Sequence, residues 1–260
     1  NGFVSHNALR SSIKDSTILV SIIHGNNEIG TINNIEKLGK TCNDKNIPFL
    51  VDAAQTFGKI PIDVNKGNIS MLAGSGHKIY GPKGVGFLYK NRNLVIDPII
   101  HGGGHEFGLR SGTANVPGIA GLAVACKLML DNQDEEKEKL NNFVQKFIVG
   151  IENSGLEFFI NGPTSNRLPG NLNICLKGVD ADWLCTMLND VAIARGSACT
   201  SETIQPSHVL RSIGLKDDDA NSSIRVSFGR FNTSEDVNSA VSKIVTASNK
   251  YLIKKKSLAI

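Results

Sequence analysis

No apolar run in the sequence approaches the roughly 20 residues of a membrane-spanning helix, so we expect no transmembrane segment. The five cysteines are odd in number and form no C-x-x-C pair. This argues against a disulfide framework or a zinc knuckle and for a reducing compartment, the cytoplasm or the mitochondrial matrix. The net charge of +4 is small and the basic residues are scattered except for a lysine triplet near the end, so no nucleic-acid partner is expected. The chain opens with Asn1 and not Met, which predicts a processed or incomplete N-terminus.

The first half of the sequence alternates short apolar runs with amphipathic segments. Strands are predicted at 17–24, 48–51, 71–73 and 85–89, with a helix at 32–43. This order is typical of an α/β domain built on a mainly parallel sheet. In such sheets ligands bind beyond the carboxyl ends of the strands. The polar residues that follow these strands are therefore expected at one edge; they are Asn27, Asp52, Gln55 and Ser75–Lys78.

The pattern changes after a helical stretch that reaches about residue 130. The charged segment 131–139 is expected to be the exposed face of a helix leading out of the first domain. Beyond it, strands are predicted at 158–160, 171–176 and 224–228, between helices that include 183–188 and 235–252. We therefore predict a larger domain at 1–133 and a smaller α+β domain at 134–260.

The segment GSGHKIYGPKG, residues 74–84, is the densest chemical signal. A lysine that forms a Schiff base must lose its proton near neutral pH, and the glycines would let the backbone approach a cofactor. Asp52, at a predicted strand end, could keep a pyridine nitrogen protonated. A Walker A phosphate loop is excluded by spacing. From these residues alone, a cofactor site at Lys78 does not rank above a surface turn, and an aspartate at a strand end such as Asp52 is more often a helix cap or a turn residue.

Six blocks of sequence resemble those of a known protein family. In order along the chain they are SIIHGNNEIG, VDAAQTFGKIPIDV, SGHKIYGPKGVG, HGGGHEFGLRSGT, RGSACTSETIQPSHVLRSIGL and SSIRVSFGRF. From about residue 16 to about residue 245, the sequence resembles the cysteine desulfurases of the class V aminotransferase group. The resemblance implies a fold-type I pyridoxal 5'-phosphate enzyme, with an incomplete mainly parallel large domain and a smaller α+β C-terminal domain.

The resemblance also implies a role for individual residues. Lys78 would carry pyridoxal phosphate as a Schiff base, and Asp52 would pair with its ring nitrogen. The remaining cofactor contacts would come from Gln55 to the ring hydroxyl oxygen, from Ser75 and His77 to the phosphate, and from Thr113 to the phosphate in the partner subunit. That last contact implies a homodimer.

The substrate and the sulfur acceptor follow from the same resemblance. Asn27 and Arg225 would bind L-cysteine, with the planar fork of Arg225 on its carboxylate. Cys199 would attack the substrate sulfur and hold it as a persulfide, leaving L-alanine. The persulfide would pass to an iron–sulfur scaffold protein or a tRNA-thiolation carrier. The other four cysteines, Cys42, Cys126, Cys175 and Cys185, are assigned to packing.

Two other functions are weighed against this one. Selenocysteine lyases share the cofactor site, but the GSACTS loop favours a desulfurase. A non-catalytic partner protein is the other alternative, because the family normally has a region before the first block. That region supplies a histidine on the cofactor ring and a phosphate-binding turn, so this polypeptide alone is expected to bind the cofactor poorly or to be inactive. A metal site at His101 and His105 is disfavoured, because three glycines separate them.

Overall fold

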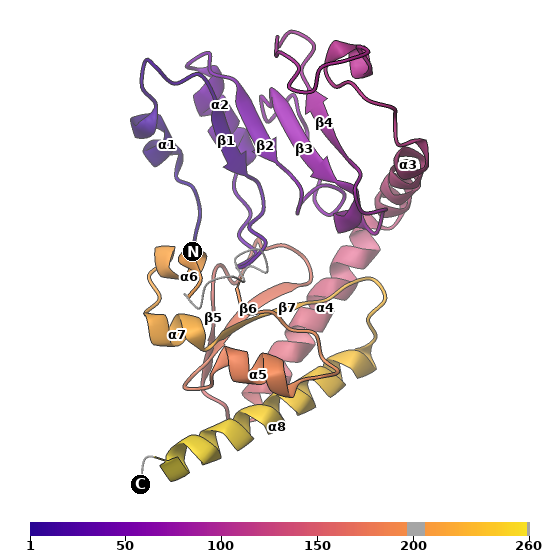
Figure 1. Ribbon diagram of the computed structural model, residues 1–260. Coiled ribbons are helices and arrows are strands. Elements are labelled where there is room, and N and C mark those ends of the chain that lie inside the picture. Colours follow the sequence, from indigo (N-terminus) through magenta and orange to yellow (C-terminus); the bar gives the residue numbers. More distant parts are fainter. Residues whose placement is uncertain (197–205, 259–260) are drawn as a thin grey trace. The chain divides into compact units, whose positions relative to one another are not determined.

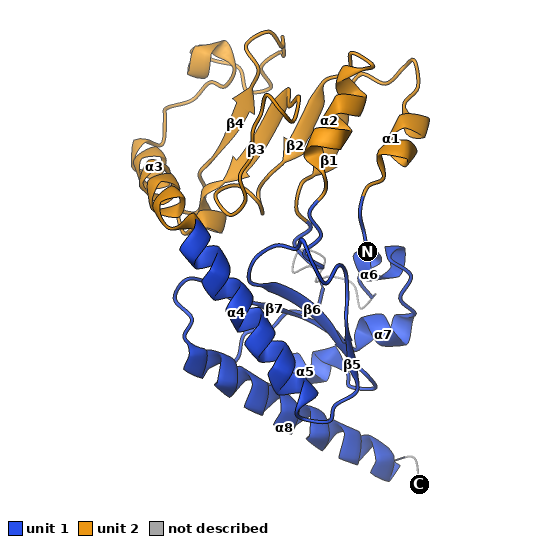
Figure 2. Ribbon diagram, turned by 180° about the vertical axis from the view of Figure 1, so that it is seen from behind, with its two compact units in different colours: residues 1–3, 26–32, 134–260 blue, residues 4–25, 33–133 orange. Residues whose placement is uncertain are grey.

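The computed structural model describes residues 1–196 and 206–258. Within these residues the chain forms two compact units (Figure 2). Unit 1 comprises residues 1–3, 26–32 and 134–260, and unit 2 comprises residues 4–25 and 33–133. None of the described helices is both long and apolar enough to cross a membrane.

Unit 2 is built on a four-stranded sheet in the order β1 (Val20–Ile23), β2 (Phe49–Asp52), β3 (Met71–Ser75) and β4 (Gly86–Lys90) (Figure 1). β1, β2 and β3 are parallel, and β4 runs antiparallel to β3. The register pairs Ile23 with Asp52 and Asp52 with Ala73. The carboxyl ends of β1, β2 and β3 therefore lie side by side, as the sequence predicts for a mainly parallel sheet.

Helix α2 (Ile35–Asn43) shows why this part of the sequence folds as it does. The Asn34 side chain caps its first turn by accepting a hydrogen bond from the Lys37 amide. Its apolar residues recur at helical spacing and pack on the sheet in a cluster that contains Leu38, Phe49 and Val51. Gly39 allows a close approach, because a Cβ there would lie 1.8 Å from the Gly67 carbonyl oxygen.

Four further helical elements belong to unit 2. Helix α1 (His6–Ser12) precedes the sheet in sequence, and the short 3-10 helix η2 (Glu106–Gly108) follows β4. Helix α3 (Val116–Asp131) buries Leu122, Ala125 and Met129 against Ile79. Ile79 belongs to the 3-10 helix η1 (Gly76–Ile79), so α3 packs against the turn that holds Lys78.

Unit 1 is built on an antiparallel sheet of β5 (Phe158–Ile160), β6 (Asn171–Leu176) and β7 (Ser223–Ser227). Because side chains alternate along a strand, the sheet has two different faces. The apolar face, with residues such as Ile174 and Ile224, joins a core with helices α4 (Gln133–Glu152), α5 (Ala181–Met187) and α8 (Ser234–Leu258). The polar face carries Asn173 paired in register with Arg225. Helices α6 (His208–Ser212) and α7 (Asp217–Asn221) complete the unit.

The predicted elements compare closely with the observed ones, with one topological difference. The chain passes from unit 2 to unit 1 at Gln133–Asp134. Residues 26–32, however, pack in unit 1, although the sequence assigns them to the first domain. Hydrogen bonds explain this: Leu168 donates its amide to the Gly30 carbonyl, and Thr31 bridges to Arg167. The division into a larger domain at 1–133 and a smaller domain at 134–260 stays a prediction.

Candidate active site

Lys78 lies in the turn that directly follows β3. The turn is closed by hydrogen bonds from the Gly76 amide to the Val85 carbonyl and from the Gly81 amide to the Gly76 carbonyl. Tyr80 ends it with a left-handed φ of 64°. Buried Ile79 anchors the turn, while Lys78 is half-buried. Within the described part of the chain, the Lys78 amine has no hydrogen bond or ion pair, so it is available for chemistry.

Ser75 and His77 lie on either side of buried Gly76 and meet through their side chains. The Ser75 hydroxyl and the Nδ1 atom of His77 are 2.9 Å apart. Ser75 is the last residue of β3, and His77 is exposed. A hydroxyl and an imidazole held together at the end of a strand are suitable donors for a phosphate group.

Asp52 ends the neighbouring strand β2. Its Oδ1 atom accepts a hydrogen bond from the Ala54 amide at 2.9 Å, and the Ala53 amide donates to the Ala73 carbonyl at 2.9 Å. Because Asp52 pairs with Ala73, it lies two register positions before Ser75 across the sheet. Asp52 is half-buried and, among the described residues, has no salt bridge within 4.0 Å. Gln55 is half-buried in the turns that follow.

His24, at the end of β1, is a residue that the sequence analysis did not single out. Its amide donates to the Asp52 carbonyl oxygen at 2.9 Å, and its carbonyl accepts from the Asn33 amide at 2.8 Å. Its side chain is 3% exposed, and its Nδ1 atom has no hydrogen-bond partner among the described residues. Burial lowers the pKa of the imidazole to about 4, so His24 is neutral at neutral pH. The only local signal was its place at the end of an apolar strand.

Asn27 and Arg225, the two predicted substrate-binding residues, lie together in unit 1. The Nη1 atom of Arg225 donates to the Asn27 carbonyl oxygen at 3.5 Å, and the Asn171 side-chain amide donates to the same oxygen at 3.2 Å. The backbone of Arg225 exchanges two hydrogen bonds with Ala194. Both predicted residues are thus tied to the polar face of the β6–β7 sheet.

The remaining predicted residues fall in loops. Thr113 is exposed, at the end of the glycine-rich segment 101–113. That segment is held internally, because the Gly112 amide donates to His105 Nδ1 at 3.2 Å and the Gly104 amide donates to Ser111 Oγ at 3.1 Å. Cys199 lies outside the described residues.

The four other cysteines are free thiols in the structure. Burial raises the pKa of Cys42, Cys126 and Cys185, and burial with the nearby Asp219 carboxylate raises that of Cys175 to about 11. Because the thiolate is the nucleophile, these four side chains are poorly suited to attack a substrate.

The family model described as aminotransferase class-V matches residues 1–239. The chain belongs to the class V aminotransferase family. The cysteine desulfurase IscS of Ruthia magnifica subsp. Calyptogena magnifica is 44% identical over 252 residues, and that of Rickettsia bellii (strain OSU 85-389) is 42% identical over the same length. Each alignment covers 96% of this chain and 62% of the relative, so the chain spans about three fifths of their length.

Solved structures agree with this assignment. SspA in complex with cysteine superposes with a TM-score of 0.73 at 36% identity, covering 89% of this chain and 65% of that one. The class V aminotransferase fold, a fold-type I α/β architecture with a mainly parallel sheet, is therefore confirmed for this chain.

Class V aminotransferases such as the cysteine desulfurases use pyridoxal phosphate. Unit 2 supplies the groups that this cofactor needs: the Lys78 amine for its aldehyde, the Asp52 carboxylate for its ring nitrogen, and a hydroxyl–imidazole pair for its phosphate. Within the described residues, neither the amine nor the carboxylate forms an ion pair. The residues present therefore fit the group.

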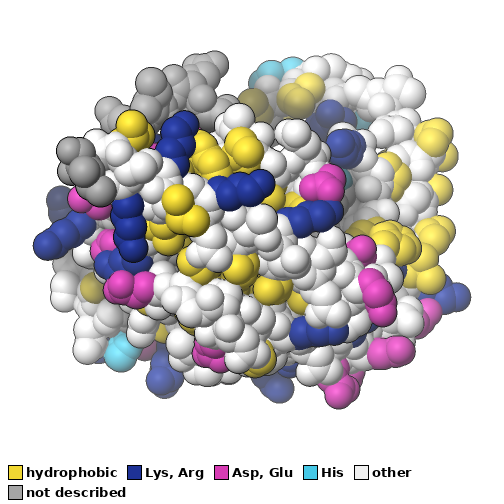
Figure 3. Space-filling view, turned by 90° about the horizontal axis from the view of Figure 1, so that it is seen from below, with side chains coloured by type: hydrophobic (Ala, Val, Ile, Leu, Met, Phe, Trp, Pro, Cys, Tyr) yellow, Lys and Arg dark blue, Asp and Glu magenta, His cyan; other side chains and the backbone are white. Residues whose placement is uncertain are grey.

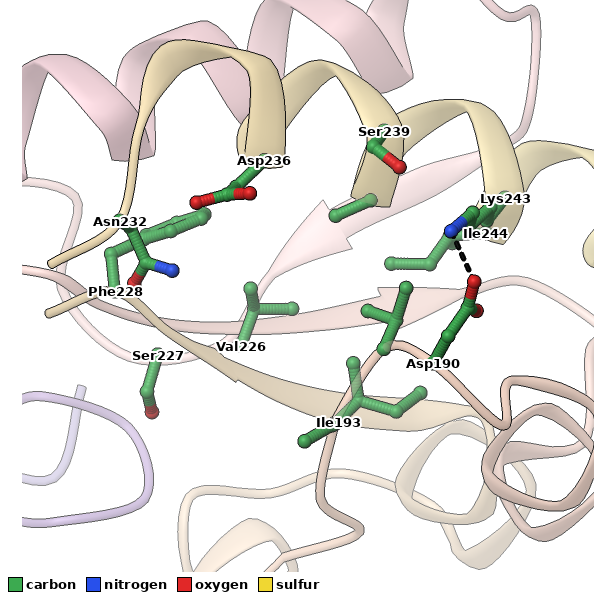
Figure 4. Close-up of a pocket in the computed structure, with 13 residues that line it drawn as sticks. Asp190, Ile193, Val226, Ser227, Phe228, Asn232, Asp236, Ser239, Lys243 and Ile244 are labelled. Carbon is green, nitrogen blue, oxygen red and sulfur yellow. Dashed lines mark hydrogen bonds and ion pairs between the residues drawn. The ribbon is translucent and has the colours of Figure 1, made fainter.

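A cavity of about 440 Å³ in this class V aminotransferase lies elsewhere, in unit 1 (Figure 4). Its walls come from β7, the start of α8 and residues 190–193. The charged residues Asp190 and Lys243 pair across it. Asp236 accepts a hydrogen bond from the Thr233 amide. Among the residues that the structure describes, none of the predicted site residues lines this cavity.

On the face shown in Figure 3, lysine and arginine side chains are scattered among acidic and apolar ones and form no single patch.

Proposed function

We propose that this chain is part of a cysteine desulfurase that converts L-cysteine to L-alanine and transfers the sulfur to Cys199. The observation that supports this most strongly is the 44% identity to a cysteine desulfurase across 96% of the chain. The grouping of Asp52, Ser75 and Lys78 at adjacent strand ends supports it independently, because it provides the donors for the family's cofactor. Structural similarity to a relative solved with cysteine favours an amino-acid substrate of that size.

Each residue of the site has a physical task in this proposal. Asp52 keeps the cofactor's ring nitrogen protonated, Gln55 binds the ring hydroxyl oxygen, and Ser75 and His77 hold the phosphate. Lys78 binds the aldehyde and, once released by the substrate, its Nζ atom moves the proton from the substrate Cα. Asn27 and Arg225 orient the substrate, with the guanidinium meeting its carboxylate through two parallel hydrogen bonds. When bound, the cofactor supplies a sink for the electron pair left at Cα.

The sulfur step uses Cys199. Its thiolate attacks the substrate sulfur; the new S–S bond forms as the C–S bond breaks, and the electron pair of that bond stays with the carbon. Protonation of the carbon then leaves L-alanine, and the products are alanine and a persulfide on Cys199. The mass balance is closed, because one thiol and one cysteine give one persulfide and one alanine. An iron–sulfur scaffold protein or a tRNA-thiolation carrier accepts the sulfur.

Thr113 acts on the cofactor of the partner subunit in this proposal. The exposed segment 101–113 carries Phe107, whose side chain is fully exposed on a left-handed backbone. An apolar ring displayed in this way is suited to burial in a homodimer. Thr113, at the end of the same segment, would then reach the phosphate in the partner subunit.

The experiment is turnover of L-cysteine by the whole enzyme of which this chain is part, loaded with pyridoxal phosphate, with alanine and sulfide measured together in the presence of a thiol reductant. We expect equal amounts of both products from the wild type, and neither from Cys199→Ala. The matched control is Cys185→Ala, which should retain turnover. Wild-type sulfide release by Cys199→Ala would refute the persulfide assignment, and faster release of selenide from L-selenocysteine would favour a lyase.

A further inference from the structure

Glu28 is a buried acid whose carboxylate oxygens accept no hydrogen bond within the described part of the chain. Its side chain is fully buried in unit 1, and neither carboxylate oxygen accepts a hydrogen bond from any residue that the structure describes. The Ser207 hydroxyl is the neighbouring donor, but its geometry does not complete a hydrogen bond to either oxygen. Burying a carboxylate in this way costs free energy. A buried carboxyl group that carries this cost is a candidate for a functional role.

The backbone fixes the direction of this side chain. The side-chain oxygen of Asn26 accepts hydrogen bonds from the amides of Glu28 and Ile29, both at 2.9 Å. The Gly30 amide donates to the Asn26 carbonyl at 3.1 Å and closes the loop. Gly30 has a φ of +75°, and a Cβ there would lie 2.6 Å from the Asn171 side-chain oxygen. The loop is therefore pressed against β6, and the Glu28 carboxyl group has little freedom to turn towards water.

The Glu28 carboxyl group lies beside Gly196, which directly precedes 197–205, and near Ser207, which lies shortly after that segment. A Cβ built on Gly196 would lie 3.3 Å from Glu28 Oε1 and 3.2 Å from the Ser207 Cβ. Gly196 has a φ of +54°, which favours glycine. Two residues earlier, Ala194 is hydrogen-bonded to the backbone of Arg225. The carboxyl group thus contacts both flanks of the segment, next to the proposed substrate-binding arginine.

The charges around Glu28 come from two elements. Arg225 on β7 and His208 on α6 favour its ionised form, but burial is the larger effect and raises its pKa above that of an ordinary glutamate. Arg167 also lies near this loop, but its guanidinium donates to the carbonyl oxygens of Pro163 and Ile29. Arg225 forms no salt bridge within 4.0 Å in the described chain. When Glu28 is neutral, it does not compensate the positive charge of Arg225.

We propose that Glu28 is a positioning residue for the amino-acid substrate. In its neutral form, its carboxyl group supports Gly196 and Ser207 and leaves the Arg225 guanidinium free to bind the substrate's carboxylate. Ionisation of Glu28 creates a competing anion next to Arg225 and weakens that binding. The inference depends on the proposed function for the identity of the substrate as an α-amino acid.

The test is the affinity for L-alanine, which carries the same α-carboxylate as L-cysteine but has no sulfur to transfer, between pH 5 and pH 7.5, measured by titration calorimetry on the whole enzyme of which this chain is part, loaded with pyridoxal phosphate. Across this range the ligand's carboxylate and ammonium groups keep their charges, so a change in affinity reports on the protein. For the wild type we expect the dissociation constant to rise about five- to tenfold with pH, the size of a typical coupling between two sites. Glu28→Gln, which is always neutral, should bind with the low-pH affinity at every pH.

His208→Gln is the matched control, because it removes the histidine near Glu28. The dissociation constant of this variant should still rise with pH, at a somewhat higher pH than in the wild type, because His208 favours the ionised form of Glu28. If Glu28→Gln keeps the wild-type slope, or if His208→Gln abolishes it, the inference is wrong. These results are distinct from failure of the proposed function, which would appear as a wild-type protein that forms no alanine from L-cysteine.

A second measurement needs no turnover. Carboxyl ¹³C NMR, with the Glu28 signal assigned by its absence in Glu28→Gln, should give a titration midpoint above that of an ordinary glutamate. Because coupling is reciprocal, saturating L-alanine should raise the Glu28 midpoint further. A Glu28 midpoint at the value of an ordinary glutamate, or one that L-alanine does not move, would overturn the inference.

Discussion

His24 makes the stability of unit 2 sensitive to acid. Its imidazole is 3% exposed, and burial lowers its pKa from 6.5 to about 4. Between these two values the unfolded chain binds a proton that the folded chain does not. The free energy of unfolding must therefore fall as the pH drops from about 6.5 to about 4. Below that range His24 causes no further loss.

The size of the effect follows from the shift. One pKa unit corresponds to about 1.4 kcal/mol, so the full shift is worth about 3 kcal/mol, of which about 2 kcal/mol is lost at pH 5. The shift is not discounted for solvent screening, because the ring is almost completely buried. A loss of this size is a substantial part of the stability of an ordinary domain.

The assay is hydrogen exchange read by mass spectrometry on peptides that span β1 and β2, at pH 7.5 and pH 5, corrected for the intrinsic exchange rate. Between the two pH values, wild type should lose about 2 kcal/mol more opening free energy than His24→Gln. The control His6→Gln removes an exposed histidine of the same unit and should match wild type. Equal losses in wild type and His24→Gln would refute the assignment of the acid sensitivity to this ring.

Three further predictions concern packing and reactivity. Gly39→Ala should lower the free energy of unfolding of unit 2 by about 1–3 kcal/mol in urea, because the new Cβ would overlap the Gly67 carbonyl, and this outweighs the helix preference of alanine. Exposed Lys40→Ala is the control. A stabilised Gly39→Ala would contradict this packing. Asn171→Ala should lower the free energy of unfolding by about 1–3 kcal/mol, because it removes a hydrogen-bond donor from the Asn27 carbonyl. Exposed Asn142→Ala should have little effect. An equal loss in the two variants would show that this hydrogen bond contributes nothing to stability. Iodoacetamide at pH 7 should label Cys42 and Cys175 only after unfolding, because burial keeps their thiols protonated; rapid labelling of either in the native protein would contradict the structure.

Local patterns predicted the strands and the residues at their ends. Phe49–Asp52 is an apolar run that ends in a carboxylate, and parallel pairing then places Asp52 near Ser75 without any long-range information. Helix α2 follows from its apolar spacing. The lysine turn was found because glycines and polar side chains concentrate there.

The features that the sequence did not predict depend on contacts between distant residues. Residues 26–32 join unit 1 because Arg167 and Asn171, more than 130 positions away, bind their carbonyl oxygens. The burial of His24 depends on neighbouring strands and the Asn33 loop. Arg195, for which the sequence offered no account, pairs with Asp182 and donates to the Asn221 side chain at 3.0 Å.

The central claim is that the amine of Lys78 binds the aldehyde of pyridoxal phosphate, and borohydride reduction tests it most directly. Reduction converts even a sparsely populated Schiff base into a stable secondary amine, which peptide mapping then locates. We predict that the label is on the peptide containing Lys78 and is lost in Lys78→Ala, while Lys83→Ala retains it. A label spread over several surface lysines, or one that persists in Lys78→Ala, would contradict the account.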